Sequence, residues 1–335
     1  MTQPGALTFV TVAHAGELPL LALQARSLAR NMRAQDVRAI HVYVNDRNEA
    51  EVRDRVRAMA PEYGPLADRL CVMGAADAFG GAAPPANPRG WLYRVVARYP
   101  RLQLINRGGW NGNDGWRVQQ AFKLAAARQV QSPFTVFLDT KNIFIRPVAL
   151  NDFVAPDGRA RTRFSATSEM ALRWLRASCR ALDLPARAVP PEATTFITPF
   201  SVETRILRAV LEAVERRNGP VEAFFAFRLN NATEFMLINA HCNARMGGVR
   251  RVFADGIVPS FTVWGDPALL TSVLDEAAEG GAKCLGLHRQ ALPRLEPRHH
   301  EIVSRLLIDG GIIASPDDLD LLVAAMQSGT ARRAA

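Results

Sequence analysis

Asp139 is the residue best placed to do chemistry in this sequence. It follows the continuous apolar run Phe134–Leu138, which is the pattern of a strand buried on both faces of a parallel sheet. Open α/β sheets bind their ligands in the crevice beyond the carboxyl ends of the strands. The sequence therefore predicts that the carboxylate of Asp139 lies at a ligand site.

A second group of polar side chains comes from the segment before this strand. A helix over residues 116–125, capped by Asn113 or Asp114, places one polar stripe opposite one apolar stripe at about 100° per residue. The polar stripe holds Trp116, Gln119, Gln120 and Lys123, and the apolar stripe holds Val118, Phe122 and Ala125. An ordinary solvated helix face is the alternative. Lysine is scarce in this chain, with three Lys among 41 basic residues, and two of the three lie between residues 109 and 148, which favours a functional face.

These residues resemble an uncharacterised family of bacterial glycosyltransferase-like proteins of the GT-A superfold. The resemblance rests on Gly115-Trp116, Gln119-Gln120 and Lys123-Leu124, and then on Leu138-Asp139-Thr140-Lys141-Asn142, Phe144 and Arg146-Pro147. It implies a GT-A-like α/β fold with a mostly parallel central sheet and helices on both faces. It also implies a nucleotide-diphosphate sugar donor and a glycan or other hydroxyl acceptor, as in polysaccharide biosynthesis.

The sequence departs from the usual GT-A pattern at one position. A typical GT-A site holds Mn²⁺ or Mg²⁺ with an Asp-x-Asp pair, but the second position here is Lys141, which cannot ligate a metal while protonated. Either a metal is held by Asp139 with another ligand such as His288, or the ammonium of Lys141 supplies the positive charge. We expect weak or absent metal dependence. Alternatively, Lys141 and Asn142 simply form a polar turn between two strands.

Composition bounds the protein class. The 335 residues are 48% hydrophobic and 22% charged, as in a globular protein. No apolar run is long enough to span a membrane, and the N-terminus lacks a signal-peptide pattern, so we expect a cytoplasmic protein. The net charge of +9 comes from dispersed Arg without interleaved aromatic residues, which argues against a nucleic-acid partner. The isolated cysteines argue against a zinc site; they are Cys71, Cys179, Cys242 and Cys284.

The first half of the chain predicts a nucleotide-binding βαβ unit. The strand Leu7–Ala13, a helix from Leu18 to Met32 and the strand Ala39–Val44 fit a right-handed parallel crossover. By the resemblance, the carboxyl edge of these strands receives the nucleoside, and Thr11, Asn45 and Asp46 are the candidate contacts. The alternative for Asn45-Asp46 is a cap on the following helix, Arg47–Met59.

The remaining predicted elements follow in the order of the chain. After a short strand, Leu70–Met73, the breaker-rich segment Gly80–Pro88 is either a lid or a plain connector. The second half reads as a helix, Thr167–Leu182, a strand, Thr194–Thr198, a helix, Val202–Arg216, and a late strand, Lys283–His288. We expect one GT-A-like domain over residues 1–328, with a nucleotide-binding half (1–148), an acceptor-side half (149–328) and a frayed tail (329–335).

Glu234 and His288 are the remaining candidates. Asn231-Ala232-Thr233-Glu234 matches a capping box, with Asn231 as N-cap and Glu234 at the third helical position. The resemblance places an acidic residue that opens a helix in this region, and an inverting transferase needs a carboxylate base near the acceptor hydroxyl. His288 and Arg289 follow the late strand, where the resemblance implies contact with a metal or the diphosphate.

Two functions from different classes follow. In a glycosyltransferase, Asp139 binds the donor or a metal and Glu234 is the base. The diphosphate is stabilised by Lys123, Lys141, His288 and Arg289, and the pocket is shaped by Trp116 and Gln120. The alternative is a non-catalytic protein of the same fold that binds a nucleotide sugar or an anionic glycan.

Overall fold

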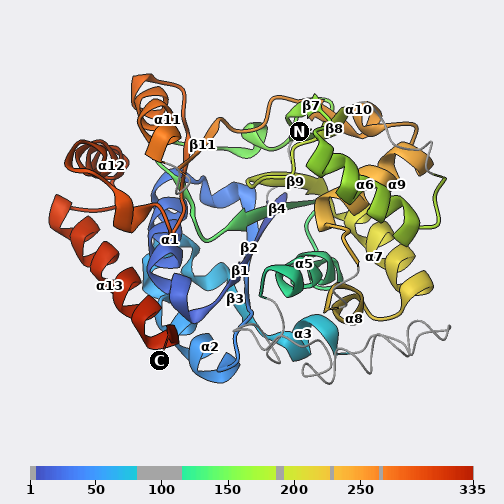
Figure 1. Cartoon of the computed structure of the whole chain (residues 1–335), viewed down its shortest axis with the longest axis horizontal. Coiled ribbons are helices and arrows are strands. Elements are labelled where there is room, and N and C mark those ends of the chain that lie inside the picture. Colours follow the sequence, from blue (N-terminus) through green and yellow to red (C-terminus); the bar gives the residue numbers. More distant parts are fainter. Residues whose placement is uncertain (1–4, 81–114, 186–191, 227–229, 264–266, 335) are drawn as a thin grey trace.

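A five-stranded sheet forms the centre of the protein. The computed structural model describes residues 5–80, 115–185, 192–226, 230–263 and 267–334. The strand order is β3 (Leu70–Met73), β2 (Val37–Val44), β1 (Leu7–Ala13), β4 (Phe134–Asp139) and β9 (Phe200–Glu203). The first four strands are parallel, and β9 pairs antiparallel with β4 at the edge (Figure 1).

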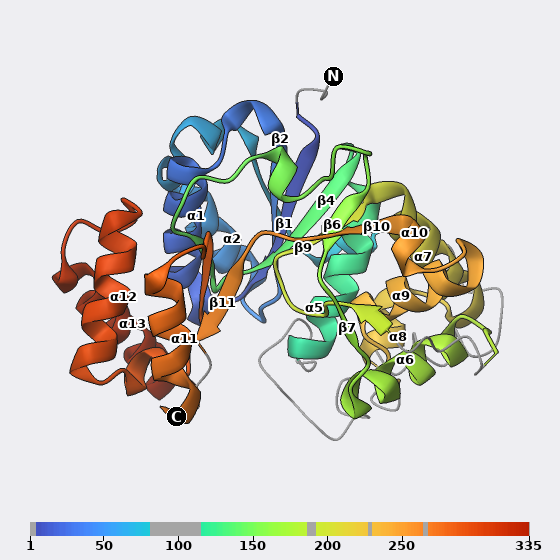
Figure 2. The same ribbon diagram turned by 90° about the horizontal axis from the view of Figure 1, so that it is seen from above.

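Helices cover both faces of this sheet because side chains of successive residues point to opposite faces. Phe9 and Val136 belong to the core under α1 (Leu18–Asn31) and α2 (Glu49–Ala58). Val10 and Phe137 belong to the other core, under the helices that follow in the chain. Those helices are α5 (Gly115–Ala125), α7 (Thr204–Asn218), α8 (Val221–Ala226) and α9 (Glu234–Arg245) (Figure 2). The prediction of a mostly parallel sheet between two helical layers is confirmed.

A second sheet connects the C-terminal part of the chain to the central sheet. Its order is β11 (Ser260–Val263), β12 (Cys284–Leu287) and β5 (Asn142–Phe144), and β5 continues directly from β4 after a turn. Helices α11 (Pro267–Glu279), α12 (Pro297–Asp309) and α13 (Pro316–Ala334) pack beside it (Figure 2). The backbone N–H of Leu287 donates to the carbonyl of Lys141 at 2.9 Å. This bond brings the end of β12 to the end of β4.

The register aligns the ends of the parallel strands. Val12 of β1 lies opposite Asp139 of β4, and Ala13 lies opposite Val44 of β2. The residues that follow these strands therefore meet at one edge of the sheet, which is where an open α/β sheet binds its ligands.

Several sequence predictions are corrected. The strand predicted at Thr194–Thr198 is β8 (Glu192–Thr194), which ends earlier. The helix predicted from Val202 begins at Thr204, because residues 200–203 form β9 and Val202 pairs with Thr135. α13 (Pro316–Ala334) enters the segment 329–335, whose predicted fraying stays a prediction. The segments predicted as a lid and as the cap of α5, except for Gly80, lie outside the described residues.

The other predicted elements match closely. The helix predicted at Thr167–Leu182 is α6 (Glu169–Ala181). Its N-cap is Ser168, whose side chain accepts a hydrogen bond from the N–H of Ala171. Smaller elements complete the described chain: α3 (Ala75–Phe79), α10 (Val249–Val252), β6 (Ala160–Thr162), β7 (Phe164–Ala166) and β10 (Phe253–Asp255). None of the described helices is long and apolar enough to cross a membrane.

Candidate functional site

A cavity of about 690 Å³ opens at the carboxyl edge of the central sheet. This volume falls within the range of small-molecule sites, about 300–1,000 Å³. Its floor is the end of β4, and its walls come from both halves of the chain. All four residues of the predicted polar stripe of α5 line the cavity: Trp116, Gln119, Gln120 and Lys123. The opposite stripe of the same helix is fully buried, as predicted.

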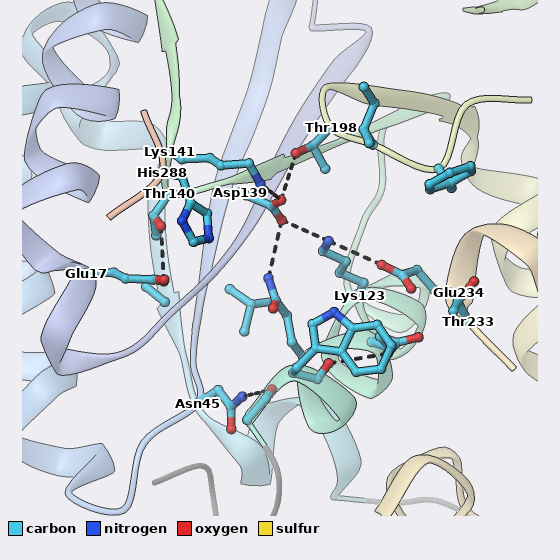
Figure 3. A pocket seen from close by; sticks show the side chains of 18 of the residues that line it. Glu17, Asn45, Lys123, Asp139, Thr140, Lys141, Thr198, Thr233, Glu234 and His288 are labelled. Atoms are coloured by element: carbon cyan, nitrogen blue, oxygen red, sulfur yellow. Dashed lines mark hydrogen bonds and ion pairs between the residues drawn. The ribbon is translucent and has the colours of Figure 1, made fainter. Parts of the chain in front are cut away.

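Asp139 lies in the middle of the cavity and accepts hydrogen bonds from four side chains (Figure 3). Lys123 donates to its Oδ1 at 3.0 Å, and Lys141 forms a short contact with its Oδ2. Gln119 and Thr198 complete the set, at 3.3 Å and 2.9 Å. Both carboxylate oxygens therefore already face cationic and polar donors of the protein.

The backbone around Asp139 is fixed by buried amide side chains. Its N–H donates to the Oδ1 of Asn142 at 2.7 Å, and its carbonyl accepts from the Nε2 of Gln24 at 2.6 Å. Asn142 is fully buried and also donates to the carbonyl of Thr198 at 3.2 Å. A turn does connect β4 to β5, but it consists of Thr140 and Lys141 rather than the predicted Lys141 and Asn142, and it holds Lys141 over Asp139. Asn142 begins β5 just after that turn.

Lys123 links Asp139 to a second carboxylate. Its Nζ lies 3.2 Å from the Oε1 of Glu234, which comes from the first turn of α9. The side chains of Lys123 and Glu234 are only 5% and 6% exposed, so their charges are nearly removed from water. The Lys123 ammonium also lies 5.1 Å from the ring centroid of Phe235.

The two carboxylates have opposite pKa shifts. Burial would raise the pKa of Asp139, but the ammonium groups of Lys123 and Lys141 outweigh it and hold that pKa well below its usual range. Burial raises the pKa of Glu234, and the single ammonium of Lys123 offsets only part of that effect. Burial would lower the pKa of Lys123, but Asp139 and Glu234 together raise it. The site thus favours the charged form of Asp139 and disfavours the charged form of Glu234.

The other side of the cavity is formed by the loop after β1 and the end of β12 (Figure 3). Glu17 accepts a hydrogen bond from Thr140 at 3.1 Å and pairs with His14 at 3.4 Å. Burial would raise the pKa of Glu17, but the hydrogen bond and charge of His14 and the hydrogen bond from Thr140 together outweigh burial and lower that pKa. Burial and the nearby charge of Lys141 lower the pKa of His288, which is therefore neutral at pH 7.

The structure brings most of the predicted site residues together. In addition to the stripe of α5, the cavity is lined by Asn45, Asp139, Lys141, Glu234, His288 and Arg289. Asn45 donates to the carbonyl of Gly115 at 2.8 Å and so joins the end of β2 to the start of α5.

Two predicted contacts lie outside the cavity. The hydroxyl of Thr11 is buried and donates to Gln24 at 2.8 Å, because its side chain points into the layer under α1. Asp46 accepts from the N–H groups of Ala15 and Asn48, both at 3.0 Å, so it stabilises the loops after β1 and β2. Asp46 is not the helix cap of the alternative prediction either, because the N-cap of α2 is Asn48.

The predicted capping box before α9 is wrong in register. Thr233 is the N-cap and its hydroxyl accepts from the N–H of Met236 at 3.3 Å, so Glu234 is the first helical residue rather than the third. Its carboxylate is consequently free of any capping role and turns to Lys123 instead.

The donor set does not suit a divalent cation. The described residues contain no group of three or more His, Cys, Asp or Glu side chains that could hold a metal ion. Asp139, the expected ligand, faces two ammonium groups, and an incoming cation would have to displace at least one of them. The expected partner His288 feels the charges of both Lys141 and Asp139, and Lys141 already occupies the Oδ2 of Asp139.

The roles of the residues that position this site were not evident from the sequence. Gln24 and Asn142 belong to this group because their amides bind the backbone of Asp139. His14 could have been found from its position, since it directly follows β1 as Asp139 ends β4. Thr198 carries no such signal, because it reaches Asp139 from a segment 59 residues later in the chain.

The fold and the cavity define an α/β protein with a cavity lined by charged and polar residues at its strand ends. A family of unknown function, DUF6492, matches residues 11–256, and the chain belongs to that family. No curated protein matches the sequence. Among solved structures, the galactosyltransferase LgtC in complex with donor and acceptor sugar analogs is similar, with 12% identity and a TM-score of 0.40, over 92% of this chain and 96% of that one.

Proposed function

We propose that this protein transfers a sugar from a nucleotide-diphosphate donor to a hydroxyl group of an acceptor. The observation that carries the proposal is the arrangement around Lys123, whose ammonium lies between the carboxylates of Asp139, with a lowered pKa, and Glu234, with a raised pKa, inside one cavity. Two carboxylates whose environments move their pKa values apart are the usual mark of divided roles in acid–base chemistry. The residues that resemble GT-A glycosyltransferases are the ones that build this arrangement.

Lys141 takes the role that a metal ion has in most GT-A sites. Its side chain is 14% exposed and lines the cavity, as does Arg289. A cation beside the diphosphate stabilises the negative charge that develops as the sugar departs. We therefore propose transfer without a required metal ion, with His288 as a neutral hydrogen-bond donor to the same group.

Glu234 acts as the base in this proposal. It takes the proton of the acceptor hydroxyl while that oxygen forms a bond to the anomeric carbon of the donor. The bond from that carbon to the diphosphate oxygen breaks, and its electron pair leaves with the diphosphate. Its raised pKa makes Glu234 a better proton acceptor than an exposed carboxylate.

A non-catalytic binding protein is the second candidate. The observation that favours it is that both oxygens of Asp139 are already occupied by donors of the protein itself. Such a protein would bind a nucleotide sugar or an anionic glycan through the same cations without turning it over.

Thermal shift with uridine and guanosine diphosphates, with and without Mn²⁺, tests the donor site. We expect stabilisation without metal, and loss of that stabilisation in Asp139→Ala. Asp275→Ala is a matched control, because this residue also forms an ion pair, with Arg298, but lies outside the cavity. Unchanged nucleotide binding by Asp139→Ala would remove the central assignment. Transfer or hydrolysis of the matching sugar donor then separates the enzyme from the binding protein.

A further inference from the structure

Exposed apolar side chains gather on one wall of the cavity. Among the described residues, five large hydrophobic side chains are classed as exposed, and three of them line this cavity: Trp116 (54%), Met170 (43%) and Ile197 (43%). Two half-buried rings, Trp174 and Phe196, line it as well. We call these five residues the aromatic wall. Exposed apolar groups that cluster at a cavity mark a binding surface.

The aromatic wall is built from three elements. Trp116 comes from α5, Met170 and Trp174 come from α6, and Phe196 and Ile197 follow β8. The two indole rings lie 6.4 Å apart at 41°, and Phe196 packs edge-on against Trp174 at 5.6 Å. The rings thus pack against each other without a ligand.

The aromatic wall is attached to the helix of the proposed base. The side chain of Asn239 on α9 is fully buried; it donates to the hydroxyl of Thr194 at 2.7 Å and accepts from the Thr194 N–H at 2.9 Å. This pair fixes the strand before Phe196 against α9, which carries Glu234. Asn45, which marks the proposed nucleotide edge, follows β2 and meets the wall only at the start of α5, through its hydrogen bond to the carbonyl of Gly115.

An unsatisfied acceptor lies beside the wall. Gln120 is 3% exposed and lines the cavity one helical turn after Trp116. Its Nε2 donates to the carbonyl of Trp116 at 3.4 Å, whereas its Oε1 has no hydrogen-bond partner among the described residues. A buried polar atom without a partner costs free energy, so this carbonyl oxygen is suited to accept a hydrogen bond from a ligand.

We propose that the aromatic wall is the acceptor subsite and that its occupant is a pyranose ring of a glycan. A pyranose has an apolar C–H face that packs on an aromatic ring, and hydroxyl groups at its edge, one of which would donate to Gln120 Oε1. A purely aliphatic occupant would leave that oxygen unsatisfied. This inference rests on the proposed transferase function, because it places the acceptor hydroxyl on the side of Glu234.

Saturation-transfer NMR on the full chain, without donor, tests the occupant. The probes are methyl cellobioside, methyl maltoside, diacetylchitobiose and n-octyl glucoside. We expect saturation on the ring protons of the saccharides, with affinity reduced about tenfold in Trp116→Ala and in Trp174→Leu. Leu321→Ala is the control, since Leu321 is a 70% exposed apolar residue on α13 that does not line the cavity.

Several outcomes would overturn this assignment. Saturation confined to the octyl chain would identify a lipid-like occupant, and saturation on none of the probes would show that the wall binds no sugar ring. Trp116→Ala keeps the test valid if the half-buried Trp174 is needed for folding. Thermal shift with nucleotide diphosphates is run on the same variants: lost nucleotide binding would show that the indoles hold a nucleobase instead. If saccharides bind and nucleotides do not, the transferase proposal fails while the wall remains a glycan site.

Discussion

The two carboxylates that share Lys123 should respond unequally to the same isosteric change. In Asp139→Asn, the amide nitrogen faces one of the two ammonium groups, donor against donor, and a buried charge pair is broken. Breaking such a pair costs about 3–5 kcal/mol. Lys123 keeps Glu234 at 3.2 Å, so we expect the lower end, about 3 kcal/mol. In Glu234→Gln, an amide oxygen still accepts from Lys123 and the desolvated charge is gone, so we expect a change within about 1 kcal/mol.

Thermal unfolding measures this difference. An entropy of unfolding of about 2.1 cal/mol/K per residue gives about 0.7 kcal/mol/K for this chain, so 3 kcal/mol lowers the Tm by about 4 °C. Asp139→Asn should therefore lose about 4 °C at pH 7, and Glu234→Gln no more than about 1.5 °C. Equal losses in the two variants, or no loss in Asp139→Asn, would refute the reasoning about the shared ammonium.

The pH dependence of the same variants follows from the directions of the pKa shifts. The pKa of Asp139 is depressed on folding, so its contribution to stability is complete above the unfolded value of about 3.9 and is lost only as the pH falls toward the folded value. The deficit of Asp139→Asn should thus be constant from pH 5 to pH 8. The pKa of Glu234 is raised, so the wild type loses stability relative to Glu234→Gln as the pH rises from about 4.3 through the folded value.

Three further predictions concern the cavity. Lys141→Asp restores a pair of acidic residues, and nucleotide diphosphates should then stabilise the protein only with Mn²⁺; stabilisation that ignores Mn²⁺ would contradict charge substitution by Lys141. Asn142→Ala leaves the N–H of Asp139 and the carbonyl of Thr198 without their partner, so urea unfolding should show a loss of about 2 kcal/mol, and an unchanged midpoint would exclude a positioning role. Glu234→Gln should lower kcat about 10²–10⁴-fold and leave nucleotide affinity unchanged in titration calorimetry; a variant with full kcat would exclude Glu234 as the base.

The sequence alone determined the strands and the polar edge of the sheet. Buried parallel strands are continuous apolar runs, so β1, β2 and β4 are visible locally, and Asp139 is visible because it ends one of them. The stripe of α5 is visible for the same reason, since a helix turns about 100° per residue. These features depend on neighbours in the chain, and the structure confirmed them with shifts of a few residues at the ends.

Contacts between distant segments required the tertiary structure. The ion pair of Lys123 with Glu234 joins α5 to α9. The N-cap of α9 is Thr233 rather than the predicted Asn231, so Glu234 faces the cavity. The bonds of Gln24 and Thr198 to Asp139 likewise span 115 and 59 residues. Periodicity carries no information about which of many polar residues will meet across a fold.

Burial decided the charges. Local sequence identified Asp139 and Glu234 as acidic residues of similar intrinsic pKa, but it could not show which of them has the lower pKa in the folded protein. That difference depends on the number of ammonium groups that face each carboxylate and on how much water is removed from it. Two ammonium groups face Asp139, and one faces the more deeply buried Glu234. Both quantities exist only once the sheet, α5 and α9 have packed together.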